Sequence, residues 1–375
     1  MHYGYSPEQE QFRAVLARFL AERAPVTAVR AQMASERGHD PALWRALAEE
    51  LGLTGVHLPE RCGGQGFGFE ELCIAQEELG RALTCAPFFA NSVLASGALV
   101  ELADAAEQDA LLPALIAGER IAALAWMTRD GAWSAEGTAL RVSGTADAVA
   151  LDGHAHFVID GLAADLLLVV ARDTRDGALG LYAVDGAAPG LTRRALATID
   201  TTRRLAALDF AACPARRLGA GRDFTQGFAR LIDRATIALA AEMIGGARAL
   251  LDQAVEYARL RMQFGRPIGA FQAIKHKLAD LLLEVEVATA AVRYAAAAVD
   301  ADDAEVPALA SQAKAMASEA CLRAAIDNIQ VHGGIGFTWD QDSHLWFKRA
   351  KSSEVLLGDA AWHRERFVTL VEAAA

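Results

Sequence analysis

Residues 321–366 read CLRAAIDNIQVHGGIGFTWDQDSHLWFKRAKSSEVLLGDAAWHRER, and the interpretation of the fold depends on this stretch. A helical pattern runs into a GGIG motif at Gly333, and a basic KRAK segment and an LGD tripeptide at Leu357 follow. Glycines at a helix end permit left-handed backbone, and they also let backbone N–H groups approach an anion. The stretch is therefore typical of either an ordinary helix end or part of a binding site.

The chain before this stretch predicts further helices. Apolar residues recur at helical spacing from Phe224 to Arg261, where Gly265-Arg266-Pro267 stops the run. A second seam follows in steps of three and four, a third helix covers about 306–331, and another begins near Asp342. These helices predict a four-helix bundle over residues 223–375. The apolar faces of these helices are compatible either with packing in the core of the bundle or with association of two chains.

The first part of the chain contains two differently patterned regions. Residues 6–55 keep helical spacing after a Ser6-Pro7 start, and helical runs continue to about Gly118. From about residue 121 apolar residues alternate, and Gly, Asp and Thr punctuate the runs. We therefore predict an α+β fold with an N-terminal helical domain (1–120), a central β domain (121–217) and the C-terminal bundle.

Composition restricts the class of protein. Hydrophobic residues make up 53% of 375 residues, and the net charge of −12 disfavours nucleic acid as a partner. We expect no membrane span, because no apolar run reaches about 18 residues without charges. The N-terminal segment carries acids rather than an apolar signal, and the five cysteines are scattered without metal-type spacing. These features predict a reduced, cytoplasmic protein without a metal site.

Polar residues and glycines gather where two helices end. Arginine offers a planar fork that suits pyrophosphate, and glycines permit close approach of an anion. The same residues are also compatible with ordinary helix C-caps. A further glycine-rich segment, 63–68, precedes Glu70 and predicts a plain turn before a helix, since an acidic helix start repels phosphate. The two helix ends contain Arg261, Gln263, Phe264, Gly265, Gln330, Gly333 and Gly334.

Several strings together resemble the acyl-CoA dehydrogenase family of flavoproteins over nearly the whole chain. The most specific is RMQFGRPIG from Arg261, followed by FQA from Phe271; the second is QVHGGIGF from Gln330. Further similar strings are WRALAEELGL from Trp44 and EELGR from Glu77. The resemblance implies a helical N-terminal domain, a central β-barrel-like domain and a C-terminal four-helix bundle that builds a tetramer.

The resemblance also implies FAD as cofactor, with its ADP half reaching a neighbouring subunit. Arg261, Gln263 and Phe264 stand where the family contacts the neighbour's FAD, as do Gln330, Gly333 and Gly334. In the β domain, Met127 lies in the loop placed over the flavin ring, and Phe157 holds the aromatic contact. The family's threonine contact is Ile159 here, which offers no hydroxyl to the flavin.

The reaction implied is α,β-dehydrogenation of an acyl-CoA thioester, with an electron-transfer flavoprotein or a similar acceptor taking the electrons. A carboxylate removes the α-proton in this chemistry. Counted without gaps from Gly333, the family's catalytic Glu falls on Leu357, which cannot accept a proton. Some members carry the base on the first long bundle helix instead, where this chain has Ala235.

Three interpretations follow from this missing base. The chain is a base-deficient subunit of a mixed tetramer with a Glu-bearing homologue, as in some bacterial members that degrade bulky acyl-CoAs such as steroid side chains. Alternatively, a displaced carboxylate serves in a homo-tetramer, with Asp359 and Glu242 as candidates. Asp359 also suits a helix start, and Glu242 a polar packing role. In the third interpretation the site performs other flavin chemistry, or binds only a thioester or a partner.

Overall fold

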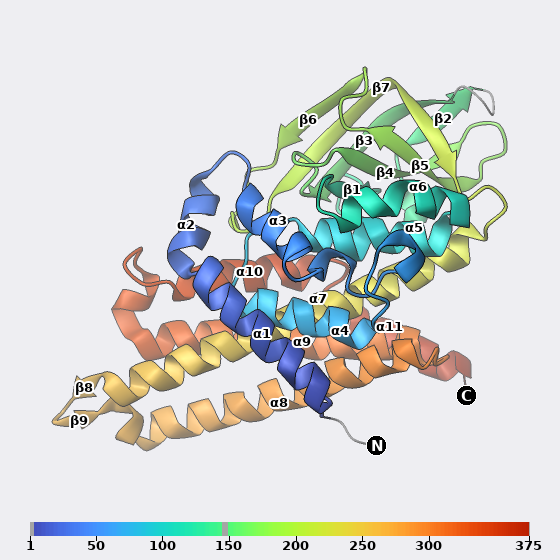
Figure 1. Ribbon diagram of the computed structural model, residues 1–375. Coiled ribbons are helices and arrows are strands. Elements are labelled where there is room, and N and C mark those ends of the chain that lie inside the picture. The colour runs from blue at the N-terminus through green and yellow to red at the C-terminus, as the bar shows by residue number, and fades with distance from the viewer. Residues whose placement is uncertain (1–3, 145–148, 375) are drawn as a thin grey trace. The chain divides into compact units, whose positions relative to one another are not determined.

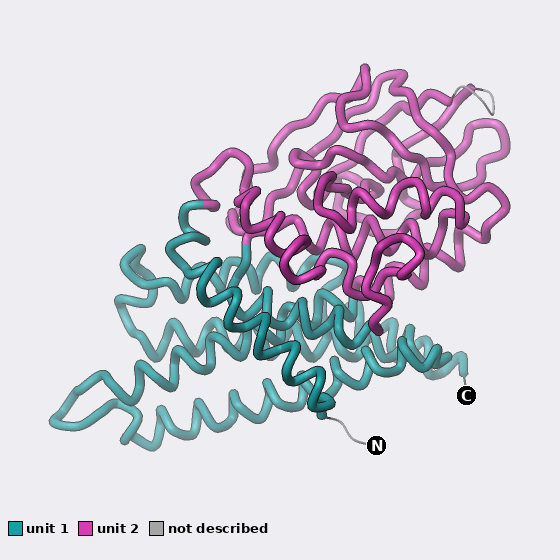
Figure 2. Tube along the Cα trace, viewed as in Figure 1, with its two compact units in different colours: residues 1–31, 69–84, 236–375 teal, residues 32–68, 85–235 magenta. Residues whose placement is uncertain are grey.

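The computed structural model describes residues 4–144 and 149–374. Residues 1–3, on which part of the expectation about a signal segment rests, lie outside this range. The chain divides into two compact units, shown in Figure 2. Unit 1 comprises residues 1–31, 69–84 and 236–375, and unit 2 comprises residues 32–68 and 85–235.

Unit 1 is helical (Figure 1). Its longest helices, α8 and α9, pack along each other, and α9 also contacts α10 and α11. Helix α7 (Phe224–Leu260) contributes its part after residue 235, and a two-stranded hairpin, β8 (Met262–Gln263) and β9 (Arg266–Pro267), follows it. The other helices of this unit are α1 (Pro7–Arg23), α4 (Phe69–Arg81), α8 (Gln272–Asp300), α9 (Val306–His332), α10 (Ser343–Val355) and α11 (Ala360–Ala374).

The start of α1 follows from its sequence. Ser6 accepts a hydrogen bond from the backbone N–H of Gln9, and the Gln9 side chain accepts one from the backbone N–H of Ser6. This reciprocal capping box satisfies two N–H groups that a helix start leaves without intrahelical partners. Pro7 occupies the first helical position, where its missing N–H costs nothing. The predicted helix start at Ser6-Pro7 is confirmed.

Unit 2 contains a mostly antiparallel sheet. Strands β4, β2, β3, β7 and β5 pair in that order, and β5 pairs again with β4, so the five strands form a closed ring. β1 runs parallel to β4 and β6 pairs with β7. The strands are β1 (Ala122–Ala125), β2 (Arg141–Gly144), β3 (Val149–Ile159), β4 (Leu166–Asp173), β5 (Leu179–Asp185), β6 (Leu191–Ala195) and β7 (Leu205–Leu218).

Short helices accompany the sheet in unit 2. Helix α2 (Val26–Ala34) crosses the boundary between the units. The barrel core is filled by alternating inward residues such as Leu167, Val169 and Leu208, all fully buried. The remaining helical elements are α3 (Pro41–Glu49), α5 (Ser96–Leu102), α6 (Ala105–Ile116), a π-helical segment (Phe89–Ala95) and 3₁₀ turns at Leu53–Gly55, Glu60–Cys62 and Ala135–Gly137.

The structure confirms the predicted fold class, with N-terminal helices, a barrel-like β region and C-terminal helices. One prediction needs refinement, because the helix expected from near Asp342 is two helices, α10 and α11. The chain breaks between them because Leu357 and Gly358 both have positive φ. None of the described helices is long and apolar enough to cross a membrane.

Candidate functional site

The junction between α10 and α11 has an unusual backbone. Leu357 has a φ of 57° and is fully buried, and Gly358 has a φ of 106°. A Cβ on Gly358 would lie 2.7 Å from Trp362 Cε3 and 2.9 Å from His363 Nε2, so glycine is required there by both space and φ. A branched side chain at positive φ is strained and persists only where its surroundings fix it.

Lys314 on α9 is one of the residues that fix the backbone around Leu357. Its ammonium is fully buried and donates to Ser318 Oγ at 3.0 Å, the Glu354 carbonyl at 3.0 Å and the Gly358 carbonyl at 2.9 Å. These three acceptors use all three N–H donors of the ammonium. Burial lowers the pKa of Lys314 to about 7, against the raising effect of Glu354 and Asp359. Lys314 therefore fixes carbonyls on both sides of Leu357.

His363 on α11 supplies a further bond to the same junction. Burial lowers its pKa to about 4, so its imidazole is neutral at pH 7. Nε2 donates to the Leu357 carbonyl at 2.9 Å, which leaves Nδ1 to accept from the Ser311 hydroxyl at 3.3 Å. Arg366 in turn donates to Ser311 Oγ at 2.9 Å. The tautomer of His363 thus follows from its partners.

Asp359 lies at the start of α11 and is exposed. Its carboxylate accepts from the backbone N–H of Trp362 at 2.8 Å, and its carbonyl accepts from that of His363 at 3.0 Å. This geometry is that of an N-cap, the alternative role that the sequence allowed.

Glu242 on α7 lies in a buried ion pair. Arg349 on α10 donates to its carboxylate at 2.9 Å, and both side chains are largely buried. Burial raises the pKa of the neighbouring Cys321 to about 12, and the charge of Glu242 adds to this rise. The pair matches the packing and polar-network role considered for Glu242. Ala235, where the resemblance places the base of some other members, is fully buried.

The structure brings together the two glycine-rich motifs of the bundle. Tyr257 of α7 stacks on His332 of α9 at 4.2 Å, so the ends of these helices meet. The residues predicted to contact FAD project outward from this end, and Phe264 is 91% exposed. An added Cβ on Gly333 or Gly334 would meet no atom of the described chain within 4 Å. These exposed residues are Arg261, Gln263, Phe264, Gln330, Gly333 and Gly334.

The two predicted flavin contacts of unit 2 lie close together, Met127 two residues after the end of β1 and Phe157 in β3. The backbone N–H of His156 donates to the Met127 carbonyl at 2.9 Å, which places Phe157 close to Met127. Phe157 has a φ of 55°, at an irregularity where β3 loses register with β7. Ile159 is buried, and its side chain supplies no hydroxyl.

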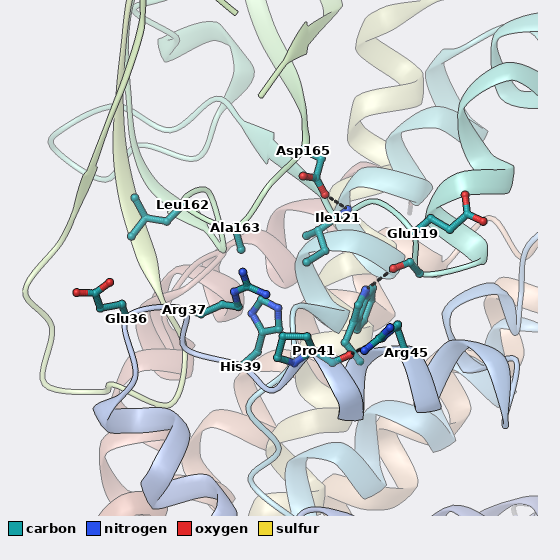
Figure 3. Close-up of a pocket in the computed structure, with 12 residues that line it drawn as sticks. Glu36, Arg37, His39, Pro41, Arg45, Glu119, Ile121, Leu162, Ala163 and Asp165 are labelled. Carbon is teal, nitrogen blue, oxygen red and sulfur yellow. Dashed lines mark hydrogen bonds between the residues drawn. The ribbon is translucent and has the colours of Figure 1, made fainter. Parts of the chain in front are cut away.

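Unit 2 also contains a cavity of about 510 Å³ (Figure 3). Its lining includes Arg37, Arg45, Asp165 and the Trp44 indole, which donates to the Gly118 carbonyl. His39 is 95% buried, and among the described residues its Nδ1 has no hydrogen-bond partner. The mixed lining offers donors and acceptors to a small polar ligand. None of the site residues predicted from the sequence lines this cavity.

The glycine-rich segment before α4 is a turn, as predicted. The first N–H groups of α4, on Phe69 and Glu70, donate to the Asp300 carboxylate at 2.7 and 2.9 Å. A carboxylate of the chain therefore occupies this helix N-terminus, where a phosphate would otherwise bind.

Sequence reasoning missed Lys314 and His363. Lysine is rarely fully buried, so nothing in an alanine-rich helical pattern marks Lys314 as a core residue. His363 has no partner at ligand spacing in the sequence, because Ser311 and Leu357 reach it only through the fold.

Comparison with known proteins agrees with this architecture. Residues 6–119 match the acyl-CoA dehydrogenase N-terminal domain, and residues 226–369 match the C-terminal domain of the same family. Acyl-CoA dehydrogenase IpdE2 of Mycobacterium tuberculosis is 38% identical over 355 residues, which cover 93% of each chain.

Two solved structures extend the likeness. A variant of the Tcur3481-Tcur3483 steroid ACAD is 33% identical with a TM-score of 0.88, covering 98% of this chain and 99% of that one. The ChsE4-ChsE5 complex from Mycobacterium tuberculosis is 28% identical with a TM-score of 0.90, covering 99% of both. From the matched domains and the identity to IpdE2, the chain belongs to the acyl-CoA dehydrogenase family.

Proposed function

We propose that this chain is a subunit of a mixed acyl-CoA dehydrogenase in which a Glu-bearing homologue supplies the catalytic base. The observation that carries the proposal is the buried Leu357 at the position where the resemblance places that base. Dehydrogenation of an acyl-CoA needs a carboxylate within hydrogen-bond reach of the α-proton. Leucine cannot take this proton.

The two carboxylates considered as displaced bases, Glu242 and Asp359, already have other partners. Glu242 is buried against the Arg349 guanidinium, which stabilises the charged form of the carboxylate. The hydrogen bond from Arg349 also holds the carboxylate oxygen in place. Asp359 caps α11 and is a shorter side chain than Glu, so reaching the substrate from this position requires giving up the cap. These contacts favour a subunit that depends on its partner for proton abstraction.

The residues at the exposed end of the bundle suit the ADP half of a neighbouring subunit's FAD. Gly333 and Gly334 leave open space above their backbone, and Arg261 offers a guanidinium for pyrophosphate. FAD, when bound, would supply the acceptor for the hydride that leaves the β-carbon of the acyl group. In unit 2, by the same resemblance, Met127 and Phe157 would contact a flavin ring, and Ile159 would offer it no hydroxyl.

The relatives support a bulky acyl substrate and a mixed assembly. One similar structure is named as a steroid ACAD, and another is a complex of two differently named chains. We therefore propose an acyl-CoA with a steroid-like or other bulky acyl group as substrate. By family resemblance, an electron-transfer flavoprotein or a similar acceptor would take the electrons.

A second candidate is a self-sufficient homo-tetramer in which Asp359 serves as the base. The observation that favours it is the position of Asp359, exposed and two residues beyond Leu357. Asp359→Asn keeps a side-chain oxygen for the cap and removes the base, so this variant separates the two candidates.

The test is co-expression with a Glu-bearing family member encoded near this chain. We expect the two chains to co-purify with flavin and to bleach it anaerobically when a bulky acyl-CoA is added. Glu→Gln at the partner's base should abolish bleaching, whereas Asp359→Asn should leave it within about threefold. Loss of bleaching in Asp359→Asn alone, with flavin retained, would favour the self-sufficient candidate.

A further inference from the structure

We propose that Lys314 and His363 are positioning residues that hold residue 357 in the geometry of a base position, so that Leu357→Glu creates a working base. This inference rests on the proposed function, which places the family's base at residue 357.

The hydrogen bonds to the junction exceed what a helix end requires. Of the three carbonyls that Lys314 and His363 bind, only that of Glu354 lies within α10, whose last carbonyls have no intrahelical partners. The carbonyls of Leu357 and Gly358 lie after α10 ends and before α11 begins. The two side chains therefore fix the loop itself.

The free-energy cost of burying Lys314 and of the positive φ at Leu357 also indicates that the loop geometry has a function. A buried ammonium is unfavourable unless all of its donors are satisfied, and Lys314 directs one of its three to the Gly358 carbonyl of this loop and another to the Glu354 carbonyl in the last turn of α10. A buried leucine needs only apolar contacts, and it gains nothing from positive φ. A catalytic carboxylate, by contrast, must be held within roughly 0.5 Å of its working position by a rigid supporting shell.

Gly358 and Asp359 complete the support. Any side chain at Gly358 would collide with Trp362 and His363, so the chain direction after residue 357 is fixed. Asp359 commits its carboxylate to the N–H of Trp362, which anchors the start of α11. The backbone around residue 357 is thus held on both sides, whatever side chain the residue carries.

The expected chemistry is proton exchange without oxidation. A carboxylate at residue 357 takes the α-proton of an acyl-CoA, and the C–H electron pair stays on the substrate as the thioester enolate. The carboxyl group exchanges its proton with deuterated solvent and returns a deuteron to the α-carbon. The net change is one hydrogen replaced by deuterium, so no oxidant is needed.

The experiment measures deuterium uptake into butyryl-CoA, octanoyl-CoA and a steroid-side-chain acyl-CoA by mass spectrometry, using the full chain in D₂O. Leu357→Glu should exchange the α-proton at least tenfold faster than Leu357→Gln, which has the same size but no base. Calorimetric titration with the same acyl-CoAs gives their affinity for each variant.

The positioning role is tested in the Leu357→Glu background. Adding Lys314→Met or His363→Phe should slow exchange at least tenfold, while acyl-CoA affinity changes less than threefold. Lys351→Met is the matched control, because this exposed lysine pairs with the side chain of Glu354 and not with the loop carbonyls; it should leave exchange unchanged. If Lys314→Met fails to fold, Lys314→Gln, which keeps two donors, replaces it.

Two results would overturn the inference. In the first, Leu357→Glu binds acyl-CoA but exchanges no faster than Leu357→Gln. In the second, both positioning variants keep the full rate of Leu357→Glu. If neither the chain nor its mixed complex binds any acyl-CoA, the proposed function itself fails, and the positioning role fails with it.

Discussion

Leu357 adopts a left-handed backbone conformation, which is unfavourable by about 1–2 kcal/mol for any residue with a Cβ. The hydrogen bonds from Lys314 and His363 to the surrounding carbonyls offset this cost. The sequence has a leucine where the resemblance places the base, and it allowed Asp359 as a helix start, because N-cap preference is a local property. It could not predict the burial of Lys314, because two of its three acceptors, the Glu354 and Gly358 carbonyls, lie 40 and 44 residues away.

His363 should make the protein sensitive to acid. Its pKa is about 4 in the folded chain and about 6.5 when unfolded, so the unfolded chain binds the proton first and stability falls as pH drops from 6.5 to 4. The full loss is about 3 kcal/mol, at 1.36 kcal/mol per pKa unit. Urea unfolding across this pH range should show a shallower decline for His363→Gln than for wild type. The exposed His276→Gln is the control and should keep the wild-type decline.

The Glu242–Arg349 pair should be important for stability. Removing one partner of a buried ion pair leaves an uncompensated charge and typically costs about 3–5 kcal/mol. Glu242→Ala should therefore lower the free energy of unfolding by that amount. The exposed pair of Arg81 with Asp252 is the control, and Arg81→Ala should cost less than about 1 kcal/mol. Equal losses in the two variants, measured by urea unfolding, would contradict this account.

At the scale of elements, α4 and α7 cross at reciprocal glycines. A Cβ on Gly80 of α4 would lie 2.1 Å from the Glu242 carbonyl, and one on Gly245 of α7 would lie 1.8 Å from the Glu77 carbonyl. The two backbones approach so closely only because neither position has a side chain. Apolar periodicity predicted both helices, since it reports which face is buried. It did not predict this contact, which depends on two residues without side chains.

Gly245→Ala should separate the two helices. Because its Cβ would meet backbone and not a movable side chain, we expect a loss of at least about 1–3 kcal/mol. The adjacent Gly246→Ala is a matched control, since its nearest neighbour lies 3.7 Å away. Helix propensity then makes Gly246→Ala neutral or stabilising by up to about 1 kcal/mol. Thermal unfolding of the two variants distinguishes them, and similar melting temperatures would refute the close contact.

Other elements could be predicted only in part. Alternation indicated strands in residues 121–217, but the parallel pairings of β4 with β1 and β2 link segments that no local pattern connects. The helix expected from near Asp342 did not include the break between α10 and α11, although Asp359 had been considered as a helix start. The π-helical turn Phe89–Ala95 carries an ordinary helical composition, so no residue type distinguishes it.

At the scale of the whole molecule, unit 1 leaves several large apolar side chains exposed. Leu283 and Val287 lie one turn apart on α8 and are 66% and 47% exposed. Exposed apolar clusters of this kind mark interaction surfaces. The apolar seams in the sequence suited either the core or self-association. In the structure seam residues such as Leu281 and Val285 are buried, whereas Leu283 and Val287 face solvent in the single chain.

Leu283→Glu should weaken assembly without unfolding the chain. Placing a charge on this face of α8 makes its burial against a second chain unfavourable, so we expect at least a tenfold weaker association. Sedimentation velocity measures this, with exposed Lys275→Glu on the same helix as control. An unchanged association constant for Leu283→Glu would exclude this face from the interface.

Whether this chain has a working base of its own decides its role in a mixed enzyme. The most direct measurement is anaerobic addition of a panel of acyl-CoAs to the flavin-loaded lone chain, followed at the flavin absorbance band. We predict no bleaching by the lone chain, and rapid bleaching once a Glu-bearing homologue is present. Bleaching by the lone chain that Asp359→Asn abolishes would contradict the account.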